Sequence, residues 1–199
     1  GDAAVTENLI FVQTANEHWM DTDDSNKIKT KFKAYDANGE LLDDGSSKLN
    51  KELHTTALAE KFFTFSQNSD DVYSLTEYTR TDRITSVATG VTINAVSDNG
   101  YFTAAGGQLN ARDAKVIDLD TSDGVIVNSA SDMARAIKDG DATGFKIAYI
   151  YNGADNNQGY LTVSTVFVLK TLTSADVEYT ATVSGTAKLG LTYDASGTG

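Results

Sequence analysis

The chain has 199 residues, with 16 Lys and Arg against 28 Asp and Glu, a formal net charge of −12, and neither Cys nor Pro. The lack of cysteine excludes disulfides, cysteine-ligated zinc or iron–sulfur sites and a thiol nucleophile. The negative charge, with no dense lysine patch to offset it, argues against nucleic acid and anionic membrane surfaces as partners. Uninterrupted apolar runs such as residues 166–169 are far shorter than the roughly 20 residues that a membrane helix needs, which also argues against membrane insertion.

The acidic residues indicate a chain rich in turns. The sequence has 21 Asp and only 7 Glu, and Asp favours turns and caps whereas Glu suits helix interiors. Together with many Thr, this composition is typical of strands joined by tight turns. An acidic, cysteine-free chain rich in Thr, Asn, Asp and Gly is also typical of proteins that Gram-positive bacteria export to their surface, so we expect an extracellular location.

The first half of the chain predicts strands and hairpins. Residues 28–35 alternate between apolar side chains and lysines, which is typical of a half-solvated strand. Asn38 and Gly39 then predict a type I′ turn. Residues 52–61 fit either a short helix or a loop. The strands expected in this half are residues 8–14, 28–35, 40–42, 62–65 and 72–78.

The second half adds further strands and the only convincing helix. Ser131 is expected to cap a helix over residues 132–139, with Gly140 at its C-terminal end. The strand over residues 160–169 is apolar on both faces, with Phe167 and Val163 predicted on one side and Val166 on the other, so we expect it to be central in its sheet. The strands expected here are residues 91–96, 101–103, 115–119, 125–127, 145–151, 160–169, 177–183 and 189–193.

These elements predict a mainly β fold, with antiparallel β-sandwich or small β-barrel modules and one short helix. The length accommodates two modules, over residues 1–90 and 91–199 with the helix at 132–139, or a single larger β domain. No internal repeat marks the boundary near Gly90.

The elements predicted for residues 115–169 follow in this order: a strand and a DG turn, a short helix ending in DGD, and then paired strands. This stretch resembles the β-rich, non-anchoring regions of bacterial S-layer-type surface proteins, which carry S-layer homology domains elsewhere in the chain. IKTKFKAYDANGELL (28–42) and KFFTFSQNSDDVYSLTEY (61–78) are similar to segments of such proteins. The resemblance implies a structural or display module of a longer exported protein, whose partners are other cell-surface subunits or cell-wall components. No S-layer homology domain is found in this sequence, so the resemblance assigns no anchoring residues.

Catalytic motifs are missing from the sequence. His18 and His54 are distant from each other, and no HExxH, phosphate-binding loop, nucleotide-binding glycine pattern or GxSxG elbow occurs. Pairs of carboxylates occur, but a chain with 28 acidic residues contains such pairs by chance, so they do not indicate a glycosidase. We therefore predict a protein that is not an enzyme, with no catalytic residues and no cofactor.

Two acidic segments, residues 21–26 and 118–124, place oxygen-bearing side chains at alternate positions, as a calcium site requires. Neither fits the EF-hand, because the glycine is displaced in the second and missing from the first, and neither has the bidentate Glu at position 12. Solvated acidic turns explain both segments more simply, so no metal ligand is assigned and calcium remains the alternative.

The remaining features each have a structural explanation beside a functional one. Trp19 lies beside His18 and several acids in the sequence, and we expect its side chain to pack in the core. The alternative is that Trp19 stacks on a sugar, which would make the chain an adhesin or carbohydrate-binding module with a glycan partner. The alternating strand carries a row of lysines, Lys29, Lys31 and Lys33. We expect this row to protect an exposed sheet edge, and the alternative is that it binds an acidic polymer. A covalent Lys–Asn or Lys–Asp crosslink is a further alternative that the sequence cannot place.

Overall fold

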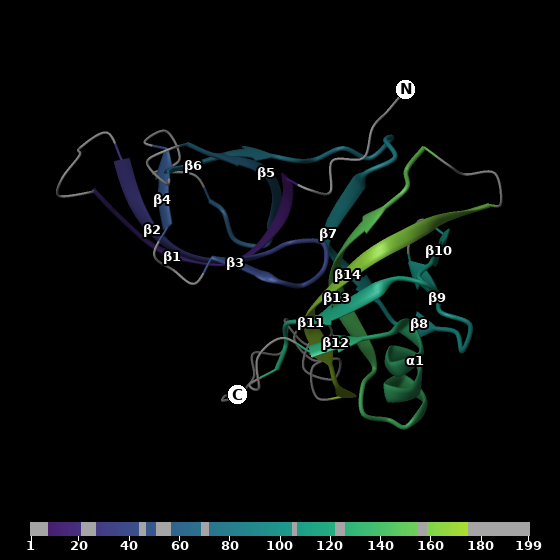
Figure 1. Cartoon of the computed structure of the whole chain (residues 1–199). Coiled ribbons are helices and arrows are strands. Elements are labelled where there is room, and N and C mark those ends of the chain that lie inside the picture. The colour runs from purple at the N-terminus through teal and green to yellow at the C-terminus, as the bar shows by residue number, and fades with distance from the viewer. Residues whose placement is uncertain are drawn as a thin grey trace, which may run out of the picture.

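The computed structural model describes residues 8–20, 27–43, 47–50, 57–68, 72–104, 107–121, 126–154 and 159–174. The strands form two mixed sheets, one of six strands and one of eight, with one short helix (Figure 1). The mainly β, sandwich-like fold with one short helix that the sequence predicts is confirmed. The predicted hairpin at 177–193 lies outside the described residues. So do residues 52–56 of the ambiguous segment 52–61, of which residues 57–60 form no helix and residue 61 begins a strand.

The first sheet contains the strands from the N-terminal part of the chain. Its hydrogen-bonded order is β1-β5-β6-β4-β2-β3, and β1 also pairs with β2, so five strands pair in a ring. The short β4–β6 pair is parallel and the other pairs are antiparallel. The strands are β1 (Leu9–Met20), β2 (Lys27–Tyr35), β3 (Leu41–Asp43), β4 (Ser47–Asn50), β5 (Lys61–Gln67) and β6 (Val72–Glu77).

The second sheet is organised around β14 (Tyr160–Leu172). β13 (Gly144–Tyr151) pairs antiparallel with β14, and β7 (Ser86–Ile93) follows beyond β13. Two other strands pair parallel with β14 in succession along its length. The predicted central position of this strand is confirmed. The other strands of this sheet are β8 (Ala95–Val96), β9 (Tyr101–Ala104), β10 (Gly107–Asn110), β11 (Lys115–Asp118) and β12 (Ile126–Asn128).

A β-bulge in β14 changes which side chains share a face. Tyr151 pairs with Val163 and Ile150 pairs with Thr165, so Ser164 is an extra residue between them. The sequence places Val163 on the face of Phe167, and this is wrong: the bulge shifts the alternation by one residue and Val163 joins Val166 on the opposite face. A single inserted residue inverts every later position of a strict two-residue period.

Three clusters of buried side chains hold the sheets together. We call them the inner core, inside the ring of the first sheet, the junction core, shared by the two sheets, and the second-sheet core, on the other face of the second sheet. The inner core includes Ile10, Phe32, Leu49, Phe63 and Leu75. The junction core includes Leu9, Phe11, Phe62, Ile117, Ile150 and Phe167. The second-sheet core includes Phe102, Leu109, Met133, Ile147, Tyr149 and Val166.

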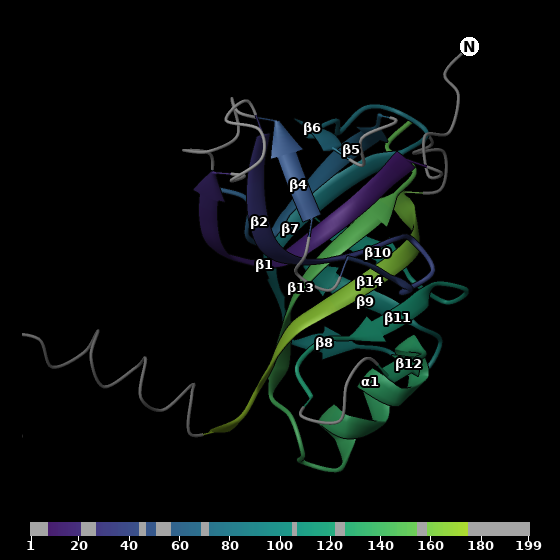
Figure 2. The same ribbon diagram turned by 60° about the vertical axis from the view of Figure 1, so that its left-hand side comes forward.

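Alternation along single strands connects these clusters. On β1, Ile10 points into the inner core and Phe11 into the junction core. On β13, Ile147 belongs to the second-sheet core and Ile150 to the junction core. Figures 1 and 2 show the first sheet and the helix on opposite sides of β13 and β14. Strands β13 and β14 are therefore covered on both faces, which explains their continuous apolar sequences.

Polar contacts also join the sheets. Thr165 Oγ1 on β14 donates a hydrogen bond of 3.1 Å to the carbonyl of Ala37, in the β2–β3 turn. Glu60, just before β5, accepts a hydrogen bond of 2.8 Å at its carbonyl from Thr89 Oγ1, and its carboxylate lies 3.3 Å from Lys146 Nζ.

The module boundary that the sequence predicts at residue 90 falls inside β7. The strand pairings pass from one sheet to the other between β6 and β7. The division into modules at that residue stays a prediction.

The helix α1 (Ala130–Lys138) begins earlier than its sequence predicts. Ser129, not Ser131, is the N-cap: its Oγ accepts the backbone N–H of Asp132 and the Asp132 carboxylate accepts the backbone N–H of Ser129. This reciprocal capping box satisfies two N–H groups that a helix start leaves unpaired. The expected start at residue 132, with Ser131 as its cap, is therefore wrong, whereas Gly140 follows the helix with a φ of 81°, as predicted.

The first hairpin forms with a different turn from the predicted one. Gly39 has a φ of 83°, but Asn38 does not have a positive φ, and a type I′ turn needs both. The Gly39 N–H donates to the Asp36 carbonyl at 3.1 Å, as in a type I turn followed by a left-handed glycine. Asp36 decides the outcome because its Oδ1 accepts the N–H groups of both Asn38 and Glu40.

Candidate functional site

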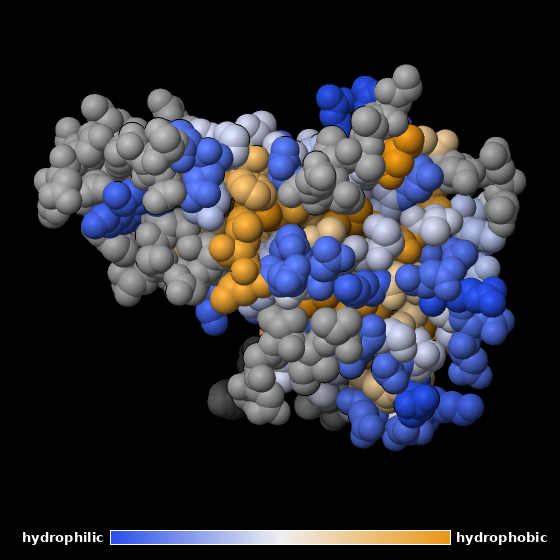
Figure 3. Space-filling model, in the orientation of Figure 1, coloured by the Kyte–Doolittle hydropathy of each residue, from blue (hydrophilic) through white to orange (hydrophobic). Residues whose placement is uncertain are grey.

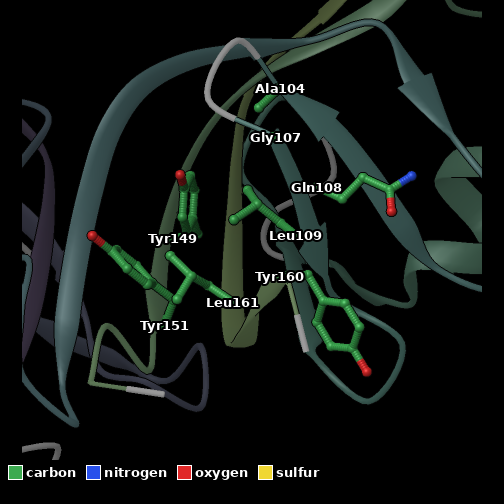
Figure 4. Close-up of a pocket in the computed structure, with 9 residues that line it drawn as sticks. Ala104, Gly107, Gln108, Leu109, Tyr149, Tyr151, Tyr160 and Leu161 are labelled. Atoms are coloured by element: carbon green, nitrogen blue, oxygen red, sulfur yellow. The ribbon is translucent and has the colours of Figure 1, made fainter. Parts of the chain in front are cut away.

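A cavity of about 320 Å3 opens on the second sheet, at the end of the second-sheet core. Tyr149 and Tyr151 line it from β13, Leu109 from β10 and Leu161 from β14. Figure 4 shows these four side chains on one side of the sheet, whereas Gln108 and Tyr160 point away from them. This arrangement follows from alternation, since Gln108 precedes Leu109 and Tyr160 precedes Leu161. We call it the tyrosine cavity.

The two tyrosines form one wall of the tyrosine cavity. Their ring centroids are 5.4 Å apart at an angle of 51°. Burial raises the pKa of Tyr149, and the neighbouring Tyr151 raises it further; burial followed by the negative charge of Asp82 raises the pKa of Tyr151. Both hydroxyls therefore stay protonated near neutral pH and are able to donate hydrogen bonds.

The two hydroxyls differ in their partners. The Tyr151 hydroxyl donates to the Thr81 carbonyl at 3.4 Å. The Tyr149 hydroxyl has no hydrogen-bond partner among the described residues, and it is not sealed from solvent. It is therefore the polar group of the cavity that is free to bind a further molecule, as far as the described part of the chain shows.

Two glycines shape the mouth of the tyrosine cavity. Gly107 and Gly159 line it with φ values of 128° and 76°. No described atom lies within 4 Å of the place where a Cβ would stand on either residue. Their peptide groups are thus unshielded by a side chain, which allows a bound molecule to approach the backbone closely.

A second, more polar cavity of about 500 Å3 lies where the β2–β3 turn meets the second sheet. Asp36, Asp113, Lys115, Ser164 and Thr165 are among its lining residues. Asp36 and Thr165 already make the turn and inter-sheet hydrogen bonds described above. This cavity is part of the polar contact between the two sheets.

The described part of the second acidic segment is built into the fold. Asp118 Oδ1 accepts the N–H of Asp120 at 3.0 Å, and Asp120 Oδ2 accepts the N–H of Thr171 on β14 at 2.7 Å. Burial, and secondarily the charge of Asp120, raises the pKa of Asp118, while the hydrogen bond from Asp120 lowers it. Within the described ranges no three His, Asp or Glu side chains gather as a metal ion requires. Residues 21–26 and 122–124 lie outside those ranges.

The strands that carry Trp19, Lys29 and Lys33 belong to the first sheet and do not line the tyrosine cavity. Trp19 and His18 belong to β1, where the Trp19 backbone pairs with Lys29 of β2, and His54 lies outside the described residues. Lys33 is exposed and Lys29 partly exposed on β2, opposite the buried Ile28 face. The alternating strand is thus confirmed, although β2 pairs on both sides and is not an edge.

Sequence reasoning did not single out the tyrosine cavity. Tyr149 and Tyr151 occur two residues apart on one strand, which is the available signal, but the same spacing is typical of ordinary core residues. Leu109 and Leu161 come from strands 52 residues apart in numbering, and only the parallel pairing of Leu109 with Leu161 brings them together. Such a pairing of distant strands has no local signature in the sequence.

Comparisons with known proteins give no relative. No protein family, no curated protein and no solved structure matches the chain at a significant level. Among the described residues, no helix combines the length and the apolar character needed to cross a bilayer.

Proposed function

We propose that the chain is a non-enzymatic structural or display module of an exported bacterial cell-surface protein of the S-layer type, acting through its folded bulk and its contacts with other surface subunits or cell-wall components. The observation that carries this proposal is the junction core, to which both sheets contribute fully buried side chains. A body joined in this way keeps the two sheets at a fixed spacing, which is what a spacer or lattice subunit needs.

The composition supports the same proposal. A cysteine-free chain is insensitive to the redox state outside the cell. Among the described residues only Leu41 and Ile84 are large apolar side chains with substantial exposure. On the face that Figure 3 shows, hydrophobic side chains gather in the middle, with hydrophilic side chains on either side. A net charge of −12 keeps such a surface soluble at high local concentration.

Antibody labelling of cells tests the location. An antibody raised against this chain is applied to intact cells of the source organism and to permeabilised cells, with an antibody against a cytoplasmic protein as control. We expect equal labelling of the chain in both samples. Labelling that appears only after permeabilisation would overturn the proposal.

Light scattering coupled to size-exclusion chromatography tests the subunit contacts. The protein is measured at several concentrations, with calcium and then with a chelator. A lattice subunit is expected to form oligomers whose size rises with concentration, and loss of the oligomers in chelator would assign calcium to an acidic segment. A monomer at all concentrations would contradict self-assembly and restrict the proposal to a spacer.

A further inference from the structure

We propose that the tyrosine cavity binds a single neutral sugar ring, a binding activity that goes beyond the display role and does not depend on it. The first argument is volume. About 320 Å3 lies at the lower end of the range for small-molecule sites, which is roughly 300–1,000 Å3. A cavity of this size suits one pyranose ring better than an extended polymer or a peptide strand.

The second argument is the distribution of polar and apolar groups. Leu109, Leu161 and the rings of Tyr149 and Tyr151 present an apolar wall on one side (Figure 4). The Tyr149 hydroxyl, which has no hydrogen-bond partner among the described residues, supplies a polar group at its border, and the space beside Gly107 and Gly159 lets a ligand approach the backbone. A pyranose ring has the matching character, with C–H groups on its faces and hydroxyls around its edge.

A purely apolar ligand fits this arrangement less well. Such a ligand would take water from the Tyr149 hydroxyl without giving a hydrogen bond in return, and a polar group buried in this way carries a free-energy penalty. Aromatic rings with a polar tip, by contrast, are suited to a partner that is apolar on one side and hydrated on the other.

The third argument is charge. Among the described residues that line the cavity there is no lysine, arginine, aspartate or glutamate, and the chain as a whole carries a net charge of −12. An anionic sugar would meet this negative field without a cation among those lining residues to receive it. The ligand is therefore a neutral sugar.

Saturation-transfer NMR on the whole chain tests the assignment. The probes are methyl pyranosides of glucose, galactose, mannose and N-acetylglucosamine, together with methyl glucuronide as an anionic counterpart. We expect transfer to the ring C–H protons of at least one neutral pyranoside and a weaker signal from the glucuronide. Absence of transfer to every neutral pyranoside, or equal binding of the glucuronide, would overturn the proposal.

Three variants locate the binding. Tyr149→Phe keeps the aromatic wall and removes one hydroxyl, so the affinity is expected to fall about two- to tenfold. Leu161→Trp fills the cavity and is expected to abolish the signal. Tyr35→Phe is the matched control, because Tyr35 lies in the first sheet, where its hydroxyl donates to Gln13, and its removal should leave binding unchanged.

The pattern of losses decides the outcome. Transfer that persists unchanged in Tyr149→Phe and in a folded Leu161→Trp would place the sugar elsewhere and overturn the assignment. Binding of a short phenylalanine-containing peptide in place of any pyranoside would assign the cavity to a peptide instead. Either failure leaves the surface-display proposal standing, because that proposal is tested on cells and by light scattering.

Discussion

At the scale of single residues, Phe167 is the side chain on which the junction core is built. It is fully buried on β14. Its ring is stacked on Phe11, with 4.8 Å between centroids, and meets Phe62 edge-on, with 6.0 Å between centroids. Phe11 and Phe62 belong to the first sheet, whereas Phe167 belongs to the second. This three-ring contact is therefore a direct apolar link between sheets formed by distant parts of the chain.

Phe167→Ala is expected to lower the free energy of unfolding by about 3–5 kcal/mol, because it removes the ring and leaves a cavity between the sheets. Urea denaturation followed by circular dichroism measures the loss. Phe65→Ala, on the partly exposed end of β5, is the control and should cost less. Equal losses in the two variants would contradict the central place of Phe167.

Asp118 gives a prediction on pH. Its pKa is raised in the folded state, chiefly by burial, so the folded protein binds this proton more tightly than the unfolded chain does. The ionised carboxylate therefore weakens folding at neutral pH, and this cost disappears as the pH falls through the raised pKa. We expect Asp118→Asn to be more stable than the parent at pH 7, by a margin that shrinks in acid.

Chemical denaturation at a series of pH values checks this margin. Asn keeps the side-chain oxygen that accepts the Asp120 N–H, so the comparison isolates the charge. Asp98→Asn, at an exposed position, serves as the control for the loss of one negative charge. A margin for Asp118→Asn that grows in acid would mean that the sign of the pKa shift is wrong.

At the scale of elements, the caps and turns depend on which of several polar side chains reaches the backbone. Ser129 and Ser131 both precede the helical pattern, and their hydroxyls lie 2.9 Å apart. Only Ser129 takes part in the capping box with Asp132. The difference is a shift of two residues, which hydrophobic spacing does not resolve.

Ser129→Ala is expected to destabilise the protein by about 1 kcal/mol, within a range of roughly 0.5–2 kcal/mol for N-cap residues. Ser131→Ala, inside the first turn, is the matched variant and should stay within about 0.5 kcal/mol of the parent. Thermal unfolding of the two variants side by side checks the assignment. The reverse order of stabilities would restore Ser131 as the cap.

The same scale shows what the sequence can and cannot predict. Strands with a strong period, such as β2 and β13, and the hairpin at Gly39 follow from local patterns and are found where expected. The bulge at Ser164 and the type of the first turn do not follow, because each depends on hydrogen bonds to a partner strand or to one particular carboxylate. The tyrosine cavity depends on parallel pairing of distant strands and is equally invisible to local pattern.

At the scale of the whole molecule, apolar and polar contacts unite the two sheets. The junction core, the hydrogen bond from Thr165 to Ala37 and the ion pair of Lys146 with Glu60 all cross between the sheets. The exposed ion pair contributes little by itself, since such pairs are worth roughly 0–1 kcal/mol. Burial of the apolar side chains is the larger contribution, and it predicts that neither sheet unfolds independently of the other.

Hydrogen-exchange mass spectrometry across a urea series tests this union most directly. Peptides that cover β1 and β5 report on the first sheet, and peptides that cover β13 and β14 report on the second. We predict that both sets lose protection at the same urea concentration, in one cooperative transition. Loss of protection in one sheet at a distinctly lower urea concentration, while the other remains protected, would contradict cooperative unfolding of the two sheets.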